Sequence, residues 1–506
     1  MSAVTALSAL ARLREVLGEI VDLQRAAELL QWDQETYMPP GGVEDRAAQL
    51  STLQRLAHER FLSEEVARLL ERAEAEVEEL PYDSDEASLV RVTRRDLELA
   101  ARVPPELVAA RAGAAARAAS AWREARAASD WSRFAPHMET SVELSRRLAE
   151  AIGYEERPYD ALLRISEPGL STERVEALFA ELRTFLVPLV RRLAELTDRV
   201  DDRVLDRPCP RDPQLALALE VIRELGYDLN RGRQDLSAHP FCAAFGPGDV
   251  RLTTRVGSRL RDAALLSSVH ESGHAMYEQG IPRSLDRTPL WGGASPGVHE
   301  SQSRLWENQV GRSRPFWEWC LPRLRLALGE TVADLEVDRL WRALNKVRPG
   351  YVRVEADEVT YNLHVLLRFE IEQELLEGRL RVVDVPDAWA VRLRDHLGLE
   401  RPSDALGPLQ DIHWCSGLGH FVGYTLGNLI AAQLMEAARR DLPDLDRQIA
   451  GGRFGGLLGW LREHVHRHGR KFTPDELVRR ATGSTICAGP WIAYVEAKVA
   501  AVYGLT

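Results

Sequence analysis

Apolar residues recur along most of this chain at the three- and four-residue steps that place them on one face of an α-helix. Near the N-terminus they form a stripe on one long predicted helix, at Leu7, Leu10, Leu13, Leu17, Ile20 and Leu23. Two prolines, at positions 104 and 105, open a second predicted helix over residues 106–129. The same periodicity predicts helices over residues 175–196, 215–225, 359–376 and 421–439. We therefore expect a mostly helical protein.

Strand signals are scarce by comparison. The clearest is an alternating run over residues 249–256, and a second strand is expected at residues 380–385. The chain has no internal repeat, low-complexity tract or long Ser/Gly linker that would mark a domain boundary. We therefore expect residues 1–506 to form a single large domain.

Composition and charge narrow the class of protein. The chain has 506 residues, of which 45% are hydrophobic, and this excludes a mainly disordered chain. Its formal net charge is −12, so we expect no general attraction to nucleic acid or to an anionic membrane. Charged residues interrupt the apolar residues at the N-terminus, no stretch is apolar enough to span a membrane, and the five scattered cysteines include no Cys-x-x-Cys pair. Together these features predict a cytoplasmic protein.

The most informative motif is His270-Glu-Ser-Gly-His274. On a helix, residues four apart lie on the same face, so His270 and His274 can share one metal ion. Glu271 points beside that metal, where its carboxylate can take a proton from a metal-bound water. The motif favours a zinc hydrolase over two surface histidines that pair with a neighbouring glutamate.

A catalytic zinc usually has three protein ligands and one water, so one protein ligand is still missing. Residues 295–302 begin like a second helix, because Ser295 is a suitable N-cap and Pro296 a suitable first helical residue. This helix offers both Glu300 and His299 as the third ligand. Spacing alone does not separate the two.

Several blocks resemble one family, the thermostable metallocarboxypeptidases of peptidase family M32, also called Taq-type carboxypeptidases. In that family's order, the matching blocks are Trp32 to Gly41, Asp249-Val-Arg251-Leu-Thr253, His270-Glu-Ser-Gly-His274, His299-Glu300-Ser-Gln302, Val352-Arg353-Val-Glu-Ala356-Asp357 and Gly407-Pro-Leu-Gln410-Asp411-Ile-His413-Trp414. Within this resemblance Glu300, rather than His299, is the third metal ligand. The blocks span nearly the whole chain.

The resemblance implies an all-α zinc peptidase, related in fold to angiotensin-converting enzyme and neurolysin. Two helical halves would flank a deep groove with the metal at its floor and a very small β element near the active site. Members of the family are usually homodimers that remove single residues from the C-terminus of peptides, with broad specificity. Each subunit would hold one Zn²⁺, with Co²⁺ as an alternative metal, and act on peptides with a free C-terminal carboxylate.

One position departs from the related thermolysin-like pattern. Four residues after the glutamate ligand, those proteins carry an aspartate that orients a zinc histidine, and here that residue is Arg304. Which group orients the histidines here is therefore open. Glu278 and Glu307 are the two candidates.

The resemblance also suggests how the substrate is held. Tyr424 and His413 are similar to the His-and-Tyr segment of the converting enzyme that binds the tetrahedral intermediate, with His420 in reserve.

A carboxypeptidase must also recognise a chain-end carboxylate, and a desolvated arginine is its natural partner. We rank Arg353 first and Arg251 second for this role. Asp249 and Thr253 share a strand face with Arg251 and could orient it, whereas Asp357 could hold Arg353 in a structural ion pair.

Two alternatives belong to other classes. A zinc oligo-endopeptidase on the same fold would cleave peptides whose ends are blocked. A non-enzymatic helical scaffold would bind no stoichiometric zinc, and replacing Glu271 would leave its function intact.

Overall fold

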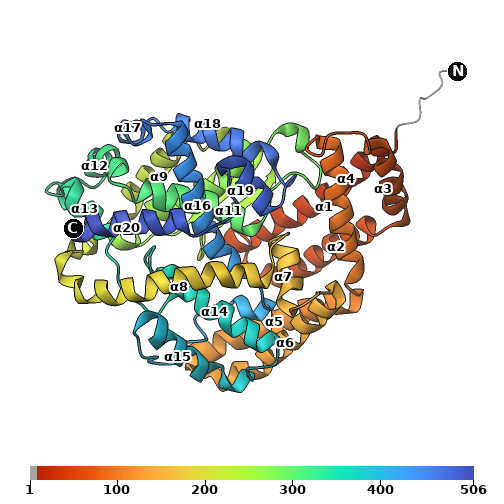
Figure 1. The fold of residues 1–506 in the computed structure, drawn as a ribbon, viewed down its shortest axis with the longest axis horizontal. Helices are drawn as coiled ribbons and strands as arrows, with labels where there is room; N and C mark the ends of the chain where they lie inside the picture. Colours follow the sequence, from red (N-terminus) through yellow and green to blue (C-terminus); the bar gives the residue numbers. More distant parts are fainter. Residues whose placement is uncertain (1–7, 506) are drawn as a thin grey trace.

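The computed structural model describes residues 8–505 and is built mainly of helices (Figure 1). The expected N-terminal stripe lies on α1 (Ala9–Thr36), where Leu13, Leu17 and Ile20 are buried, while Leu7 lies outside the described residues. Ser8 caps this helix by accepting a hydrogen bond from the backbone N–H of Ala11.

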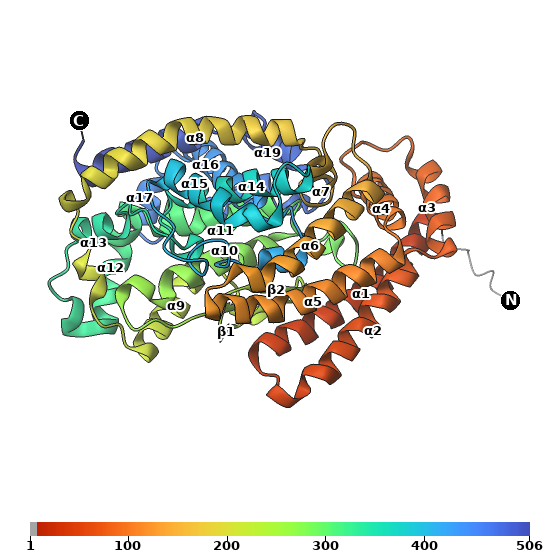
Figure 2. The same ribbon diagram turned by 90° about the horizontal axis from the view of Figure 1, so that it is seen from below.

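The helices that follow α1 complete the N-terminal part of the chain. Their bounds are α2 (Val43–Phe61), α3 (Glu64–Val77), α4 (Asp85–Arg102), α5 (Pro105–Ala128), α6 (Trp131–Ile152) and α7 (Pro158–Ser166). Helices α1 to α4 occupy one end of the molecule, on the right in Figures 1 and 2. Here α1 packs against α2 and α3, and α5 packs against α6. The helix predicted over residues 106–129 is therefore confirmed as α5.

The middle of the chain holds the long helix α8 and the elements around the predicted metal motif. These are α8 (Thr172–Glu195), α9 (Arg211–Leu225), α10 (Ala264–Gly280), α11 (Pro296–Arg304) and the π-helical stretch η7 (Leu305–Gly311). α10 packs against both α9 and α11. In Figures 1 and 2, α11 lies near the centre of the molecule.

The remaining helices cover this centre. Their bounds are α12 (Arg314–Leu328), α13 (Val337–Leu344), α14 (Tyr361–Leu376), α15 (Val385–Leu397), α16 (Val422–Asp441), α17 (Leu445–Ala450), α18 (Gly455–His464), α19 (Pro474–Thr482) and α20 (Gly489–Tyr503). α16 packs closely along α11. The helices predicted over residues 175–196, 215–225, 359–376 and 421–439 are confirmed as α8, α9, α14 and α16.

A small sheet lies beside the metal motif. Its strands are β1 (Gln234–Leu236), β2 (Cys242–Gly246) and β3 (Asp249–Thr254), in the order β1-β3-β2. β3 pairs in parallel with β1 and antiparallel with β2, and α10 packs against β3. The strand predicted at residues 249–256 is confirmed, and the sheet is the small β element that we expected.

The second expected strand, at residues 380–385, is wrong. Residues Val382–Asp384 form a 3₁₀ turn that leads into α15. Pro386 stands in the first turn of that helix, where its fixed φ favours helical backbone. Val382 is buried and Val383 is exposed, and this pair imitates the alternation of a strand over too short a run.

None of the helices between residues 8 and 505 is both long and apolar enough to cross a membrane.

Candidate metal centre

The two histidines of the motif stand one turn apart on α10, and their rings lie 5.1 Å apart. Gly273, between them, faces the backbone of α11. A Cβ atom at this position would lie 2.6 Å from the backbone O of Gln302 and 2.6 Å from the Cα of Ser303. A side chain there would clash, so glycine costs the helix about 1 kcal/mol against alanine but admits α11.

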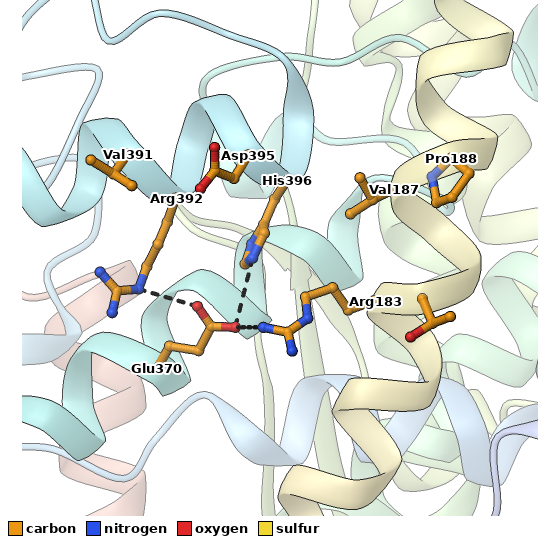
Figure 3. A pocket seen from close by; sticks show the side chains of 9 residues that line it. Arg183, Val187, Pro188, Glu370, Val391, Arg392, Asp395 and His396 are labelled. Atoms are coloured by element: carbon orange, nitrogen blue, oxygen red, sulfur yellow. Dashed lines mark hydrogen bonds and ion pairs between the residues drawn. The ribbon is translucent and has the colours of Figure 1, made fainter.

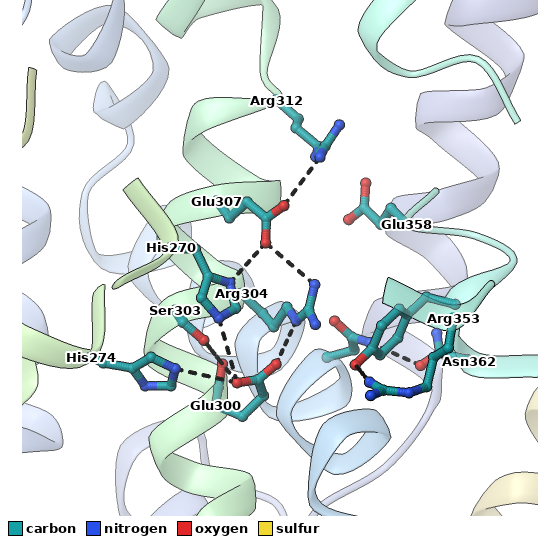
Figure 4. Close-up of polar contacts among 12 residues, drawn as sticks. His270, His274, Glu300, Ser303, Arg304, Glu307, Arg312, Arg353, Glu358 and Asn362 are labelled. Atoms are coloured by element: carbon teal, nitrogen blue, oxygen red, sulfur yellow. Dashed lines mark hydrogen bonds and ion pairs between the residues drawn. The ribbon is translucent and has the colours of Figure 1, made fainter. Parts of the chain in front are cut away.

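α11 brings Glu300 to the histidines (Figure 4). Its Oε2 atom lies 3.3 Å from Nε2 of His274 and 3.8 Å from Nε2 of His270. One ligand atom from each of the three residues lies within 4.8 Å of the others, a separation that lets them share one ion. The N-terminus of α11 is as expected, because Ser295 accepts a hydrogen bond from the N–H of Val298.

His299, the competing ligand, is not part of this group. Its Nε2 atom lies 2.8 Å from Oε1 of Glu278, and its ring stacks on that of His274 at 4.5 Å. The structure thus brings together the residues that the resemblance selected.

Glu307, the second carboxylate candidate, lies in η7 beside His270. Its Oε2 atom is 2.9 Å from Nδ1 of His270 and 3.3 Å from NH1 of Arg304. Its other oxygen accepts from Arg312 at 3.1 Å. Of the two candidates, Glu307 therefore contacts a histidine of the group, whereas Glu278 contacts His299. π-helical stretches such as η7 are frequent at functional sites.

Arg304 compensates the charge of the group. Its Nε donates to Oε1 of Glu300 at 2.7 Å, and its guanidinium lies 4.4 Å from the ring centroid of Tyr361. Burial opposes ionisation of Glu300, but Arg304 and the histidines outweigh it and hold its pKa well below the usual range. The residue that departs from the thermolysin-like pattern thus pairs with the carboxylate of the group.

Burial also shifts the neighbouring groups. It raises the pKa of Glu271 to about 7, although His270 opposes the shift. It lowers the pKa of His274 to about 3, so this imidazole is neutral near pH 7 and its Nε2 can bind a metal. A carboxylate with a pKa near neutrality is suited to accept and return a proton.

Tyr424 and His413 lie together, as the resemblance implies. Nε2 of His413 is 3.0 Å from the hydroxyl of Tyr424, and burial lowers the pKa of His413 to about 4. Burial raises the pKa of Tyr424 above its ordinary value. Near pH 7 the tyrosine therefore keeps its proton and can donate a hydrogen bond. His420 is outside this contact.

Arg353 lies next to Tyr424 and is buried. Its guanidinium lies 4.8 Å from the Tyr424 ring centroid, and NH1 donates to the hydroxyl of Tyr361 at 2.7 Å. NH2 donates to Oδ1 of Asp411 at 2.8 Å. The suggestion that Asp357 pairs with Arg353 is wrong, because the Asp357 carboxylate accepts from backbone N–H groups and a threonine hydroxyl instead.

Arg251 projects from β3 and is partly buried. It donates to both oxygens of Asp249, at 2.8 and 2.7 Å, and lies 4.4 Å from the Trp32 ring centroid. Thr253 does not orient it, because the hydroxyl of Thr253 contacts Ser237 and Phe241. Two of the matched blocks, at Trp32 and Asp249, therefore meet at this arginine.

The buried carboxylate of Glu372 lies next to Trp414, the residue that follows His413. Glu372 accepts hydrogen bonds from the indole of Trp414 at 3.0 Å, the N–H of Gly419 at 3.1 Å and the hydroxyl of Tyr159 at 2.8 Å. It thereby ties together both ends of the loop that follows His413. Burial raises its pKa to about 7.

A pocket of about 550 Å³ lies between α8 and α15 and shares no residue with the metal group (Figure 3). Glu370 accepts hydrogen bonds there from Arg183 and Arg392, at 2.9 and 3.1 Å. The charges of Glu370, Arg183 and Arg392 in this pocket therefore pair with one another.

Sequence reasoning missed Arg304, Asp411, Tyr361 and Glu372 as neighbours of the site. The four-residue spacing of Glu300 and Arg304 is a helical ion-pair signal that could have been recognised. Asp411 is 58 residues from Arg353 in the sequence, and neither residue signals the other.

Two histidines and a glutamate from adjacent helices, with the Glu307 carboxylate beside His270, form a group that can hold a metal ion in a mainly helical protein. The chain belongs to the carboxypeptidase Taq (M32) metallopeptidase family, which matches residues 12–499, and it is therefore a peptide hydrolase.

Known relatives cover nearly the whole chain. It is 42% identical to thermostable carboxypeptidase 1 of Thermus thermophilus, over 97% of this chain and 98% of that protein. An M32 carboxypeptidase from Deinococcus radiodurans has a crystal structure with a TM-score of 0.93 and 43% identity, covering 98% of this chain and 100% of that one. The carboxypeptidase of Pyrococcus furiosus also has a TM-score of 0.93, with 36% identity over 98% of this chain and 100% of that one.

Proposed function

We propose that this protein is a zinc-dependent carboxypeptidase that removes single residues from the C-terminus of peptides with broad specificity. The observation that carries the proposal is the His270, His274 and Glu300 group, with its ligand atoms within 4.8 Å of one another. Two nitrogens and one carboxylate oxygen fit zinc and leave a fourth position free. Cobalt suits the same donors, and we expect one ion per subunit.

Zinc held there lowers the pKa of a water towards 7 and polarises the scissile carbonyl. Glu271 accepts the proton of the attacking water and then delivers it to the leaving amine. The same position on α10 that keeps Glu271 out of the metal group leaves its carboxylate free for this transfer. Its pKa, raised to about 7 by burial, lets it do both near neutral pH.

The negative charge that develops on the carbonyl oxygen needs a donor placed in advance. Tyr424 supplies the hydroxyl hydrogen, and His413, a neutral ring whose Nε2 lies 3.0 Å from that hydroxyl, orients it by donating its one ring N–H to the Tyr424 oxygen. Both groups are largely desolvated, and this strengthens such hydrogen bonds.

A guanidinium near Tyr424 recognises the free C-terminal carboxylate. Arg353 remains the first candidate because it is buried and lies 4.8 Å from the Tyr424 ring centroid. Arg251, whose side chain is more exposed than that of Arg353, remains the second; each of the two already pairs with an aspartate.

The test is a time course on one short peptide with a free or an amidated C-terminus, followed by mass spectrometry. We expect successive loss of single C-terminal residues from the free acid, little cleavage of the amide, and no cleavage after a chelator removes the metal. Internal cleavage of both peptides would favour the oligo-endopeptidase. A homodimeric state and a cytoplasmic location stay predictions from the sequence.

A further inference from the structure

Glu167 is a fully buried carboxylate outside the metal group and outside every motif of the sequence. It follows α7 directly and has no measurable exposure to solvent. Its Oε1 atom accepts a hydrogen bond from the backbone N–H of Gly297 at 2.6 Å. Its Oε2 atom accepts no hydrogen bond of normal geometry among residues 8–505, although the hydroxyl of Ser295, the N-cap of α11, is close enough to the carboxylate to oppose the rise in its pKa. A carboxylate so deeply buried is costly, so its position calls for an explanation.

The carboxylate occupies the point where two helices begin. Gly297 is in the first turn of α11, and Gly423 is in the first turn of α16. A Cβ atom on Gly423 would lie 3.1 Å from Oε1 of Glu167 and 3.3 Å from the backbone N of Gly297. Glu167 therefore fills the junction of the two N-termini, where the positive ends of both helix dipoles favour an acceptor.

Both helices carry a residue of the proposed active site within one turn of this junction. Glu300 follows Gly297 by three residues on α11, and Tyr424 follows Gly423 directly on α16. The helices are also in tight contact, because a Cβ atom on Gly427 would lie 2.6 Å from Cγ of Glu300. A shift of either helix at the junction therefore moves Glu300 relative to Tyr424.

We propose that Glu167 is a positioning residue, which fixes the N-terminus of α11 against that of α16 and so sets the distance from Glu300 to Tyr424. This inference rests on the proposed function. The junction requires a hydrogen-bond acceptor at the distance that the Glu167 side chain spans from α7 to the N–H of Gly297. It does not require a negative charge.

Two substitutions separate reach from charge. Glu167→Gln keeps the length and an acceptor oxygen, whereas Glu167→Asp keeps the charge but withdraws it by about 1.5 Å, one C–C bond. We expect Glu167→Asp to lower Zn²⁺ affinity, measured by competition with a chelating dye, by about 10–100-fold, the usual effect of losing a partner of a metal ligand. We expect kcat to fall with KM nearly unchanged, and Glu167→Gln to stay within about threefold of wild type.

Asp202→Ala is the matched control for a purely structural loss. Asp202 is a buried carboxylate whose partners are Arg261, Lys346 and Arg348, and it contacts neither α11 nor α16. The Asp202→Ala variant should have a lower melting temperature and an unchanged Zn²⁺ affinity. If Glu167→Asp does not fold, Gly423→Ala replaces it, because this change crowds the same junction from the α16 side. Gly423→Ala should likewise lower Zn²⁺ affinity and kcat.

Wild-type Zn²⁺ affinity and kcat in Glu167→Asp would overturn the inference. An equal loss in Glu167→Gln would also overturn it, because a change that keeps the reach would then be as harmful as one that shortens it. A wild-type protein that binds no zinc or releases no C-terminal residue would instead refute the proposed function. The two failures are therefore distinguishable.

Discussion

The carboxylate of Glu307 lies 2.9 Å from Nδ1 of His270, on the side of the ring opposite Glu300. If Nε2 of His270 binds a metal, Nδ1 carries the ring proton and donates a hydrogen bond to Glu307. Arg304 and Arg312 hold that carboxylate in place. In contrast, Nδ1 of His274 has no hydrogen-bond partner in the described part of the chain. Glu307 is therefore the carboxylate that orients His270, while Arg304 holds Glu300.

Glu307→Ala should weaken zinc binding by about 10–100-fold, because His270 loses the acceptor that fixes its tautomer and ring orientation. Competition with a chelating dye measures the affinity. Glu278→Ala is the matched control, since Glu278 makes the same kind of contact, 2.8 Å, to His299 instead. Equal losses in the two variants would show that Glu307 has no special role.

His274→Ala should remove most of the metal, because it deletes one of the three donors. Metal analysis of the purified protein checks this, with one ion per chain expected for the wild type. The fold should survive, since a large hydrophobic core does not depend on one metal site in the way that a zinc finger does. Full metal occupancy in this variant would exclude His274 as a ligand.

Arg353→Ala should reduce the preference for free-acid over amidated peptides. Removing one partner of a desolvated charge pair costs about 2–5 kcal/mol, so kcat/KM on the free acid should fall by roughly 30- to several-thousand-fold. Because Arg353 also pairs with Asp411, the melting temperature should fall as well. The same measurement on Arg251→Ala ranks the two arginines, and an unchanged preference in both would place the carboxylate anchor elsewhere.

Titration of Glu372 makes the free energy of unfolding fall as pH rises. Burial raises its pKa from 4.5 to about 7, so the folded state holds a proton that the unfolded state has released between these two values. Its contribution is fully present below pH 4.5 and is lost as pH rises to about 7. The change is about 3 kcal/mol by the usual conversion of pKa shifts to free energy.

Glu372→Gln should therefore flatten the dependence of the unfolding free energy on pH over that window. Urea denaturation at a series of pH values measures it for both proteins. Parallel curves for wild type and variant would show that Glu372 titrates normally in the folded state.

The sequence predicts the elements that hold the metal group because local signals define them. The periodicity around His270 and the Ser295-Pro296 cap place two helices correctly. It does not decide between His299 and Glu300, since adjacent helical residues point about 100° apart and spacing does not say which face meets α10. That decision depends on the contact at Gly273, which is a tertiary feature.

The surroundings of the group are harder to predict for the same reason. Glu307 reaches His270 from a π-helical stretch, and Arg353 meets Asp411 from 58 residues away. Glu167 is 130 residues from Gly297 and belongs to no recognisable motif. Such contacts are set by how helices pack, and a single sequence carries little record of them.

The most direct test of the account compares zinc content and turnover in Glu271→Gln and wild type. Glutamine keeps the size and hydrogen-bonding shape of Glu271 but cannot accept the proton of the attacking water. The account predicts one zinc ion per chain in both proteins and a turnover on free-acid peptides lower by about 10²–10⁴-fold in the variant. Near-normal turnover at full zinc occupancy would contradict it, because another group would then be the base.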